Sequence, residues 1–299
     1  MKKIPLLFLV LLSINALAGR PIMDSLAKEV KKVTKMPASF SRDTLLLTSM
    51  WRYSYYSIYF HEKHSKSRLD SLEILSKKTK WKTGEGMFLM NKSYYIAYFE
   101  NDFSRGLTYA LRAKDLLEKT RNYEALAMAK VRIASTMLWN IQNIAVSKNE
   151  FLKKGMAISK EIYGLGVRAK NNEILCLGLV YQANFWNTSG NYKQALCDLK
   201  SAEKLSQEAH VEYLTKNIIY GMLSTTYNVL LDRKNALTYS EITLRLAEEQ
   251  QDYYSLLSIY RFKAEHEALK LNFTKSQEFL EKSYEYSKKI WSKEVYFNS

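Results

Sequence analysis

Proline is confined to the beginning of this 299-residue chain, at Pro5, Pro21 and Pro37, and no glycine follows Gly221. Proline removes a backbone donor and glycine weakens helices, so their scarcity from residue 38 onward favours helix throughout. Hydrophobic residues make up 47% of the chain, which is enough for a large core. The sequence therefore predicts an all-α body.

One group of small residues recurs along this body. Residues 187–205 read NTSGNYKQALCDLKSAEKL, in which Gly190 and Tyr192 precede Ala195, Leu199 and Ala202. The same offsets give Gly106, Ala110 and Ala113 after Phe103, then Ala236, Ser240 and Thr243 after Arg233, and Ser276, Leu280 and Ser283 after Phe273.

This recurrence predicts helical hairpins. Small residues at i, i+4 and i+7 share one helix face and let a second helix approach closely, while glycine or asparagine permits the tight turn. The preceding aromatic residue is expected to fill the space between neighbouring hairpins. The first small residues, at 106, 195, 236 and 276, are 89, 41 and 40 positions apart. A gap of 89 suggests two repeats of about 45, with a further unit near Glu150 and Ala157 at its last small position.

The layout resembles the tetratricopeptide repeat, in a long-period form similar to the exported sensor arrays of bacterial signalling proteins. The resemblance covers roughly residues 85–299. It implies an α-solenoid, a right-handed superhelix of about six antiparallel hairpins, with a concave surface formed by the first helix of each pair. In residues 176–208 the matching positions are Ala183, Trp186, Gly190, Tyr192, Ala195 and Ala202.

The resemblance implies a non-enzymatic scaffold that binds a protein or peptide partner, without cofactor, metal or nucleic acid. A second possibility is a periplasmic sensor portion that acts with a separate signalling kinase. Asparagine can hold a peptide backbone, and tyrosine adds apolar area together with a hydroxyl. On this basis the candidate partner-binding residues are Asn140, Asn143, Tyr181, Asn184, Asn217, Tyr220 and Tyr227.

The first 18 residues, MKKIPLLFLVLLSINALA, have the layout of a secretory signal peptide: two lysines, a short apolar core and a small-residue cleavage pattern near Ala18. The sequence therefore predicts an exported protein, periplasmic or secreted, without stable membrane insertion. The expected divisions are a signal peptide at 1–18, an N-terminal helical cap or degenerate repeat at 19–84, and the repeat array at 85–299.

The net charge of +15 is unevenly distributed. Residues 1–199 hold 31 Lys and Arg against 16 Asp and Glu, whereas residues 200–299 hold 14 of each kind. This pattern favours an anionic partner, such as a glycan or another anionic ligand, or a lysine-rich solvated surface. The clustered lysines are Lys28, Lys31, Lys32 and Lys35, and Lys77, Lys78, Lys80 and Lys82.

Residues 48–64, TSMWRYSYYSIYFHEKH, are the most aromatic stretch. A helix that is apolar nearly all round is expected to be buried between neighbours, and the alternative is an aromatic-lined groove for a peptide or sugar. The pair His61 and His64, three residues apart, is expected at a solvated helix end rather than at a metal.

Two further motifs have structural interpretations. GLGVRA at 164–169 has the residue types of the dinucleotide-binding pattern GxGxxA, but no strand precedes it, as that site requires. It is expected to form a turn between hairpins. Cys176 lies 14 residues before the turn at Gly190 and Cys197 lies 7 after it. The mismatch is about 10 Å of helix, beyond disulfide reach, so two free, buried thiols are expected.

Overall fold

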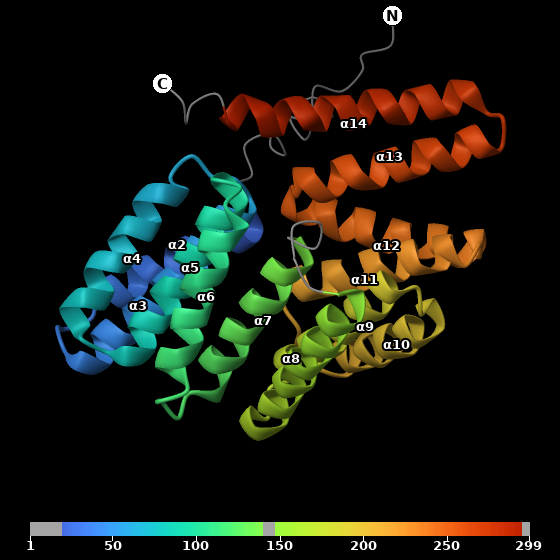
Figure 1. The fold of residues 1–299 in the computed structure, drawn as a ribbon. Helices are drawn as coiled ribbons and strands as arrows, with labels where there is room; N and C mark the ends of the chain where they lie inside the picture. Colours follow the sequence, from blue (N-terminus) through green and yellow to red (C-terminus); the bar gives the residue numbers. More distant parts are fainter. Residues whose placement is uncertain (1–19, 140–146, 295–299) are drawn as a thin grey trace, which may run out of the picture.

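The computed structural model describes residues 20–139 and 147–294, and all regular elements in these ranges are α-helices (Figure 1). The predicted signal peptide lies outside the described residues. The helices are α2 (Pro21–Thr34), α3 (Phe40–Tyr59), α4 (Ser65–Thr79), α5 (Lys82–Phe99), α6 (Phe103–Leu117), α7 (Tyr123–Trp139), α8 (Lys148–Ala169), α9 (Asn172–Ser189), α10 (Tyr192–Glu208), α11 (Tyr213–Val229), α12 (Arg233–Gln250), α13 (Tyr253–Leu269) and α14 (Phe273–Glu294).

Successive helices pack as hairpins, and each hairpin packs on the next along the chain. Six hairpins follow α2 in the described residues: α3–α4, α5–α6, α7–α8, α9–α10, α11–α12 and α13–α14. The predicted α-solenoid is thereby confirmed. No helix in the described ranges is long and apolar enough to cross a membrane.

Within several hairpins, the two helices meet at a pair of small residues. The Ser93 hydroxyl donates to the carbonyl of Gly106 at 2.7 Å, and a Cβ on Gly106 would lie 3.0 Å from the Cβ of Ala97. The Ser224 hydroxyl donates to the carbonyl of Ala236 at 2.8 Å. Helices this close leave no space for larger side chains at the contact.

The structure buries most of the small faces that the sequence predicts. Phe273 and Leu280 differ, with 67% and 51% of their surface exposed, because no described helix packs on the outer side of α14. Trp186 and Tyr192 are half-buried. The buried positions are Gly106, Ala110, Ala113, Ala183, Ala195, Leu199, Ala202, Ala236, Ser240, Thr243, Ser276 and Ser283.

The predicted register of α8 is wrong. Ala157 is exposed, and the buried face consists instead of Gly155, Ser159 and Ile162. A Cβ on Gly155 would collide with the ring of Phe185 in α9. Small faces therefore begin at 106, 155, 195, 236 and 276, so the 89-residue gap divides into 49 and 40.

The motif GLGVRA is also corrected. It is not a turn, because α8 continues to Ala169 and the chain turns at Lys170, which has a φ of 51°. A Cβ on Gly166 would lie 2.9 Å from the backbone nitrogen of Leu175, so this glycine allows α9 to approach α8.

Turns between the two helices of a hairpin repeat one backbone conformation. The residue directly before the N-cap has a positive φ, and the N-cap residue accepts a hydrogen bond from the backbone N–H three residues on. The positive-φ residues are Asn101, Gly190, Leu231 and Leu271. The capping residues are Asp102, Asn191, Asp232 and Asn272.

This shared conformation leads to opposite expectations for two substitutions. Leu231 is 79% exposed at a φ of 62°, so Leu231→Gly should relieve the left-handed strain and raise the free energy of unfolding by about 0.5–1 kcal/mol. Gly190→Ala, at a φ of 84°, should lower it by about 1 kcal/mol. Urea unfolding followed by circular dichroism measures both changes, and equal signs would contradict the shared turn geometry.

Both cysteines are free, as predicted, but only Cys176 is buried. Its thiol donates to the carbonyl of Ala202 at 3.5 Å, and burial raises its pKa to about 12. Cys197 is exposed on α10, so the prediction that it is buried is wrong.

Alkylation can test this difference. The folded protein should take up one maleimide, at Cys197, and two after unfolding in urea, because the buried Cys176 thiol is neutral and shielded. Mass spectrometry of the labelled peptides identifies the site. Rapid labelling of Cys176 in the folded state would contradict the packing of α9 on α10.

Candidate binding cavity

The N-terminal helices reach the last hairpins, so the array closes on itself. The Arg52 guanidinium on α3 donates to the carboxylate of Glu212 at 2.7 Å, and the Tyr56 hydroxyl donates to the same carboxylate at 2.7 Å. The hydroxyls of Tyr59 and Tyr213 both donate to Asp252 at 2.8 Å. These contacts place α3 against the beginnings of α11 and α13.

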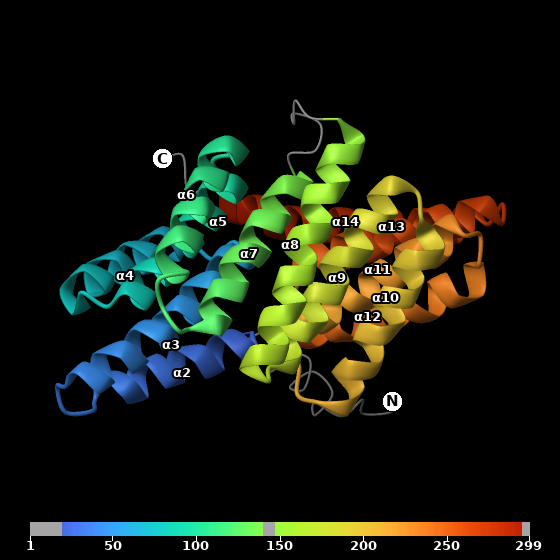
Figure 2. The same ribbon diagram turned by 60° about the horizontal axis from the view of Figure 1, so that its bottom comes forward.

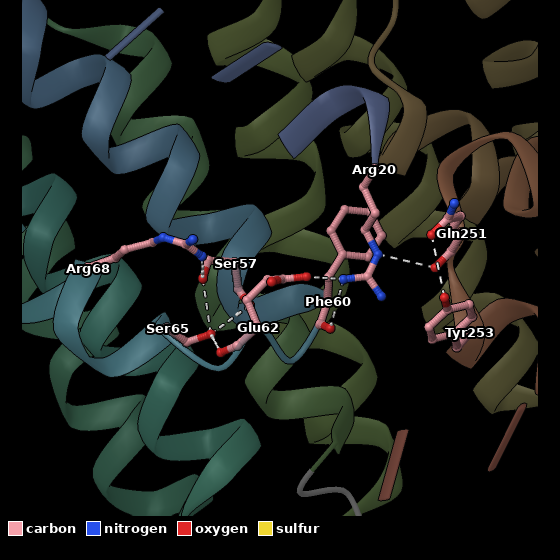
Figure 3. Close-up of polar contacts among 8 residues, drawn as sticks. All are labelled: Arg20, Ser57, Phe60, Glu62, Ser65, Arg68, Gln251 and Tyr253. Carbon is pink, nitrogen blue, oxygen red and sulfur yellow. Dashed lines mark hydrogen bonds and ion pairs between the residues drawn. The ribbon is translucent and has the colours of Figure 1, made fainter. Parts of the chain in front are cut away.

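A second set of contacts closes the array around Arg20 (Figure 3). The Arg20 guanidinium donates to the carbonyl of Gln251 at 3.2 Å and pairs with the Glu62 carboxylate. It also lies over two rings, 4.6 Å from the centroid of Phe60 and 5.2 Å from that of Tyr253. This buried cation joins the start of α2, the α3–α4 turn and the α12–α13 turn.

The closed array encloses a cavity of about 330 Å³ between the first helices of five hairpins. This volume is at the lower end of the range for small-molecule and peptide side-chain pockets. Helices α3, α5, α7, α9 and α11 contribute to its walls, together with the turns that precede them. The lining residues used below are Trp51, Arg52, Tyr55, Tyr56, Trp81, Glu124, Glu173, Tyr181, Glu212 and Thr215.

Aromatic side chains form one part of the cavity wall. Trp51, Tyr55 and Tyr56 come from α3, whereas Tyr181 comes from α9 on the opposite side. Burial raises the pKa of Tyr55 to about 12 and raises that of Tyr181, so both phenols are neutral near pH 7. The aromatic stretch is thus a buried helix, as predicted, and also contributes the aromatic lining that was the alternative.

Carboxylates form another part of the wall. Glu173 accepts hydrogen bonds from the backbone N–H of Glu212 at 2.7 Å and from the Thr215 hydroxyl. Glu124 accepts one from the Asn171 side chain at 2.9 Å. Three glutamates and one arginine give the lining an acidic balance inside a strongly basic chain. The cavity therefore favours cationic groups.

The pKa of Glu173 is shifted by its surroundings. Burial raises its pKa from 4.5 to about 7, although the hydrogen bonds from Thr215 and the Glu212 backbone oppose the shift. Near neutral pH the side chain is therefore close to half-ionised. A cation entering the cavity would favour the ionised form.

A second cleft, of about 310 Å³, lies over α11, α12 and α13. The Asn217 amide donates to the Ser255 hydroxyl at 2.8 Å, while its carbonyl oxygen is buried and has no partner in the described part of the chain. The hydroxyls of Ser224 and Thr243 donate to backbone carbonyls. The cleft consequently presents hydrogen-bond acceptors and suits a ligand that supplies N–H or O–H donors.

The structure separates the seven predicted partner-binding residues. Tyr181 lines the central cavity and Asn217 lines the second cleft. Asn184 is half-buried beside Met222, 3.6 Å from its sulfur. Tyr220 and Tyr227 each stack on Tyr239, with ring centroids 6.2 and 5.6 Å away. Asn140 and Asn143 lie outside the described residues.

His64 is exposed at the N-cap of α4, at a solvated helix end as the sequence predicts, whereas His61 is not. They lie in or next to the α3–α4 turn, where His61 has a φ of 53° and is only 5% exposed. Its ring is 4.6 Å from Tyr98 and 4.5 Å from Tyr254. Within the described ranges, no three His, Cys, Asp or Glu side chains come together as a metal site.

Sequence reasoning missed Arg52 and the acidic residues of the cavity. A signal was present, because Glu173, Glu212 and Asp252 are 39 and 40 residues apart, close to the repeat period. Each lies at the beginning of the first helix of a hairpin, where a carboxylate also favours the helix dipole.

No protein-family model matches this chain, and no curated protein matches it in sequence. Among solved structures, the apo form of RapI has a similar fold, with a TM-score of 0.51 over 81% of this chain and 99% of the RapI chain. The sequences are 12% identical, so the likeness concerns the fold alone. The fold defines this chain as a helical-repeat protein of the α-solenoid class.

The raised pKa of Glu173 leads to a pH prediction. Its proton is held more tightly in the folded state, so its contribution makes the free energy of unfolding fall as pH rises from 4.5 to about 7. The fall should amount to about 2–3 kcal/mol and should level off above pH 7.

Glu173→Gln should remove this part of the pH dependence, because glutamine does not ionise. Its amide oxygen can still accept from the backbone N–H of Glu212, and its amide nitrogen can donate to the Thr215 hydroxyl. Urea unfolding at pH 5 and pH 8 measures it, with the exposed Glu278→Gln as control. If the Glu173 variant and the parent protein lost the same stability between these pH values, the glutamate would not be buried as described.

Proposed function

We propose that this chain is a non-enzymatic scaffold that binds a segment of a protein or peptide partner in its central cavity. The observation that supports this is the cavity of about 330 Å³ between the first helices of successive hairpins, with aromatic and carboxylate walls. A helical-repeat array offers this inner surface to extended partners.

The lining suggests how a partner segment is recognised. A lysine, arginine or amino-terminal group would place its charge beside Glu173 and Glu124, while its apolar portion contacts Tyr181 and Trp51. Arg52 is already paired with Glu212, so this ion pair serves to hold α3 in place.

We further propose that the protein acts after export, because residues 1–18 have the composition of a signal peptide. A signalling partner, such as a kinase with an exported segment, is consistent with this location. The exported fraction is therefore the natural source of partner proteins.

Selection of peptides on the immobilised chain tests the cavity. Random peptides that bind should contain Lys or Arg next to apolar residues, and titration calorimetry with synthetic peptides then gives their affinities. Tyr181→Ala should weaken binding at least about tenfold, since buried aromatic anchors dominate such sites. Glu173→Gln should weaken the basic peptides selectively.

Tyr284→Ala provides the matched control, because Tyr284 is 61% exposed on α14, outside the cavity lining. Its affinity for the peptides should equal that of the parent protein. Peptides that bind the Tyr181 variant as tightly as the parent protein would show that the cavity is not the site.

A further inference from the structure

Four successive connections lie along one edge of the array. In a row of antiparallel hairpins, the turns that lead into the first helix of each hairpin are all at the same edge. Here these turns, taken with the adjoining helix ends, are residues 31–40 for α2–α3, 77–82 for α4–α5, 118–123 for α6–α7 and 167–172 for α8–α9. Figures 1 and 2 show these turns along the lower left of the molecule in both views. We call these four segments the basic edge.

The basic edge is strongly positive. Its four segments hold eleven Lys and Arg, all exposed, against a single acid, Glu118, which pairs with Lys114 and Lys130 outside the edge. The eleven cations are Lys31, Lys32, Lys35, Lys77, Lys78, Lys80, Lys82, Lys119, Arg121, Arg168 and Lys170.

Most of these cations are not neutralised by the protein itself. Among the described residues, only Lys77 has an ion pair, with Glu73 at 2.8 Å. The opposite edge is different, since its turns include Glu100, Asp102 and Asp232, and Glu100 pairs with Arg105. Lysines near helix C-termini stabilise the helix dipole, but this explains neither the number of charges nor their restriction to consecutive turns.

Apolar side chains are exposed among the same charges. Met36 and Phe40 flank the α2–α3 turn and are 42% and 65% exposed. Tyr123 is 41% exposed at the start of α7, and Val167 is 57% exposed near the end of α8. These four side chains place apolar surface directly beside the cations.

We infer that the basic edge docks on a membrane surface that carries anionic lipids. Lysine and arginine near such a surface are attracted to the headgroups, and Phe, Met, Tyr and Val can enter the boundary between headgroups and acyl chains. A soluble polyanion would use the cations alone. The protein would therefore bind the bilayer peripherally. Helices α3, α5, α7 and α9 would have their N-terminal ends at the bilayer and their C-terminal ends directed away from it.

Vesicle flotation with the full chain tests this inference. Vesicles of phosphatidylcholine with about one-third phosphatidylglycerol supply the anionic surface. Pure phosphatidylcholine vesicles measure the binding that the apolar residues 1–18 contribute without anionic lipid. A triple variant that combines Lys35→Gln, Lys78→Gln and Lys119→Gln should bind the anionic vesicles about 100-fold more weakly. Each lost charge is expected to weaken binding about fivefold, and the three effects multiply.

The control variant combines Lys193→Gln, Lys234→Gln and Lys275→Gln, which remove the same charge from exposed positions at the opposite edge. It should change vesicle binding by less than about threefold, because bulk salt screens charges at that distance. Equal losses in the two triple variants, or no excess binding to anionic over neutral vesicles, would overturn the inference.

A single substitution distinguishes lipid from soluble polyanions. Phe40→Ser should weaken binding to anionic vesicles about tenfold and leave binding to heparin unchanged, since only the bilayer accommodates the ring. If this variant kept full vesicle affinity while the basic-edge triple variant lost both ligands, the partner would be a soluble polyanion and not a membrane.

Discussion

Close contact between the two helices of each hairpin is the constraint on which the rest of the structure depends. At Gly106 and Ala236, the backbones approach until a serine hydroxyl of the first helix reaches the carbonyl of the second. This bond satisfies the buried hydroxyl, so the contact can be polar without a desolvation penalty. Because a larger side chain would force the helices apart by overpacking, these positions determine where each hairpin closes. The direction of the hairpins in turn determines which turns lie at which edge.

Closure of the array around α3 requires a different interaction. Tyr56 and Tyr59 are buried phenols that donate to Glu212 and Asp252, the acids at the beginnings of α11 and α13. Burial raises the pKa of both phenols, which keeps them protonated as donors. Acids at the same position of successive hairpins therefore have two roles. Glu212 and Asp252 hold α3 in place, whereas Glu173 lines the cavity and does not bond to α3.

Local patterns in the sequence predicted the hairpins well, because small faces and turn residues act within about forty positions. They located the contacts at Ala195, Ala236 and Ser276, and failed at α8, where the face begins 49 positions after Gly106 instead of about 45 and contains Gly155 and Ser159 in place of Ala157. The cavity was less predictable. Tyr181 was named, but its neighbours on α3 come from more than a hundred positions earlier, and only the closed array brings them together.

The two charge patterns meet at the same edge of the molecule. The turns of the basic edge carry their lysines outward, while the first helices that follow carry Glu124 and Glu173 into the cavity. Free in solution, the outer cations would oppose the approach of a cationic segment to these acids. Anionic lipids at the basic edge would neutralise that barrier and leave the field of the carboxylates in place, since charges within a Debye length act on one another. Membrane docking and binding of a basic segment would then reinforce each other through electrostatics alone, without a change in the fold.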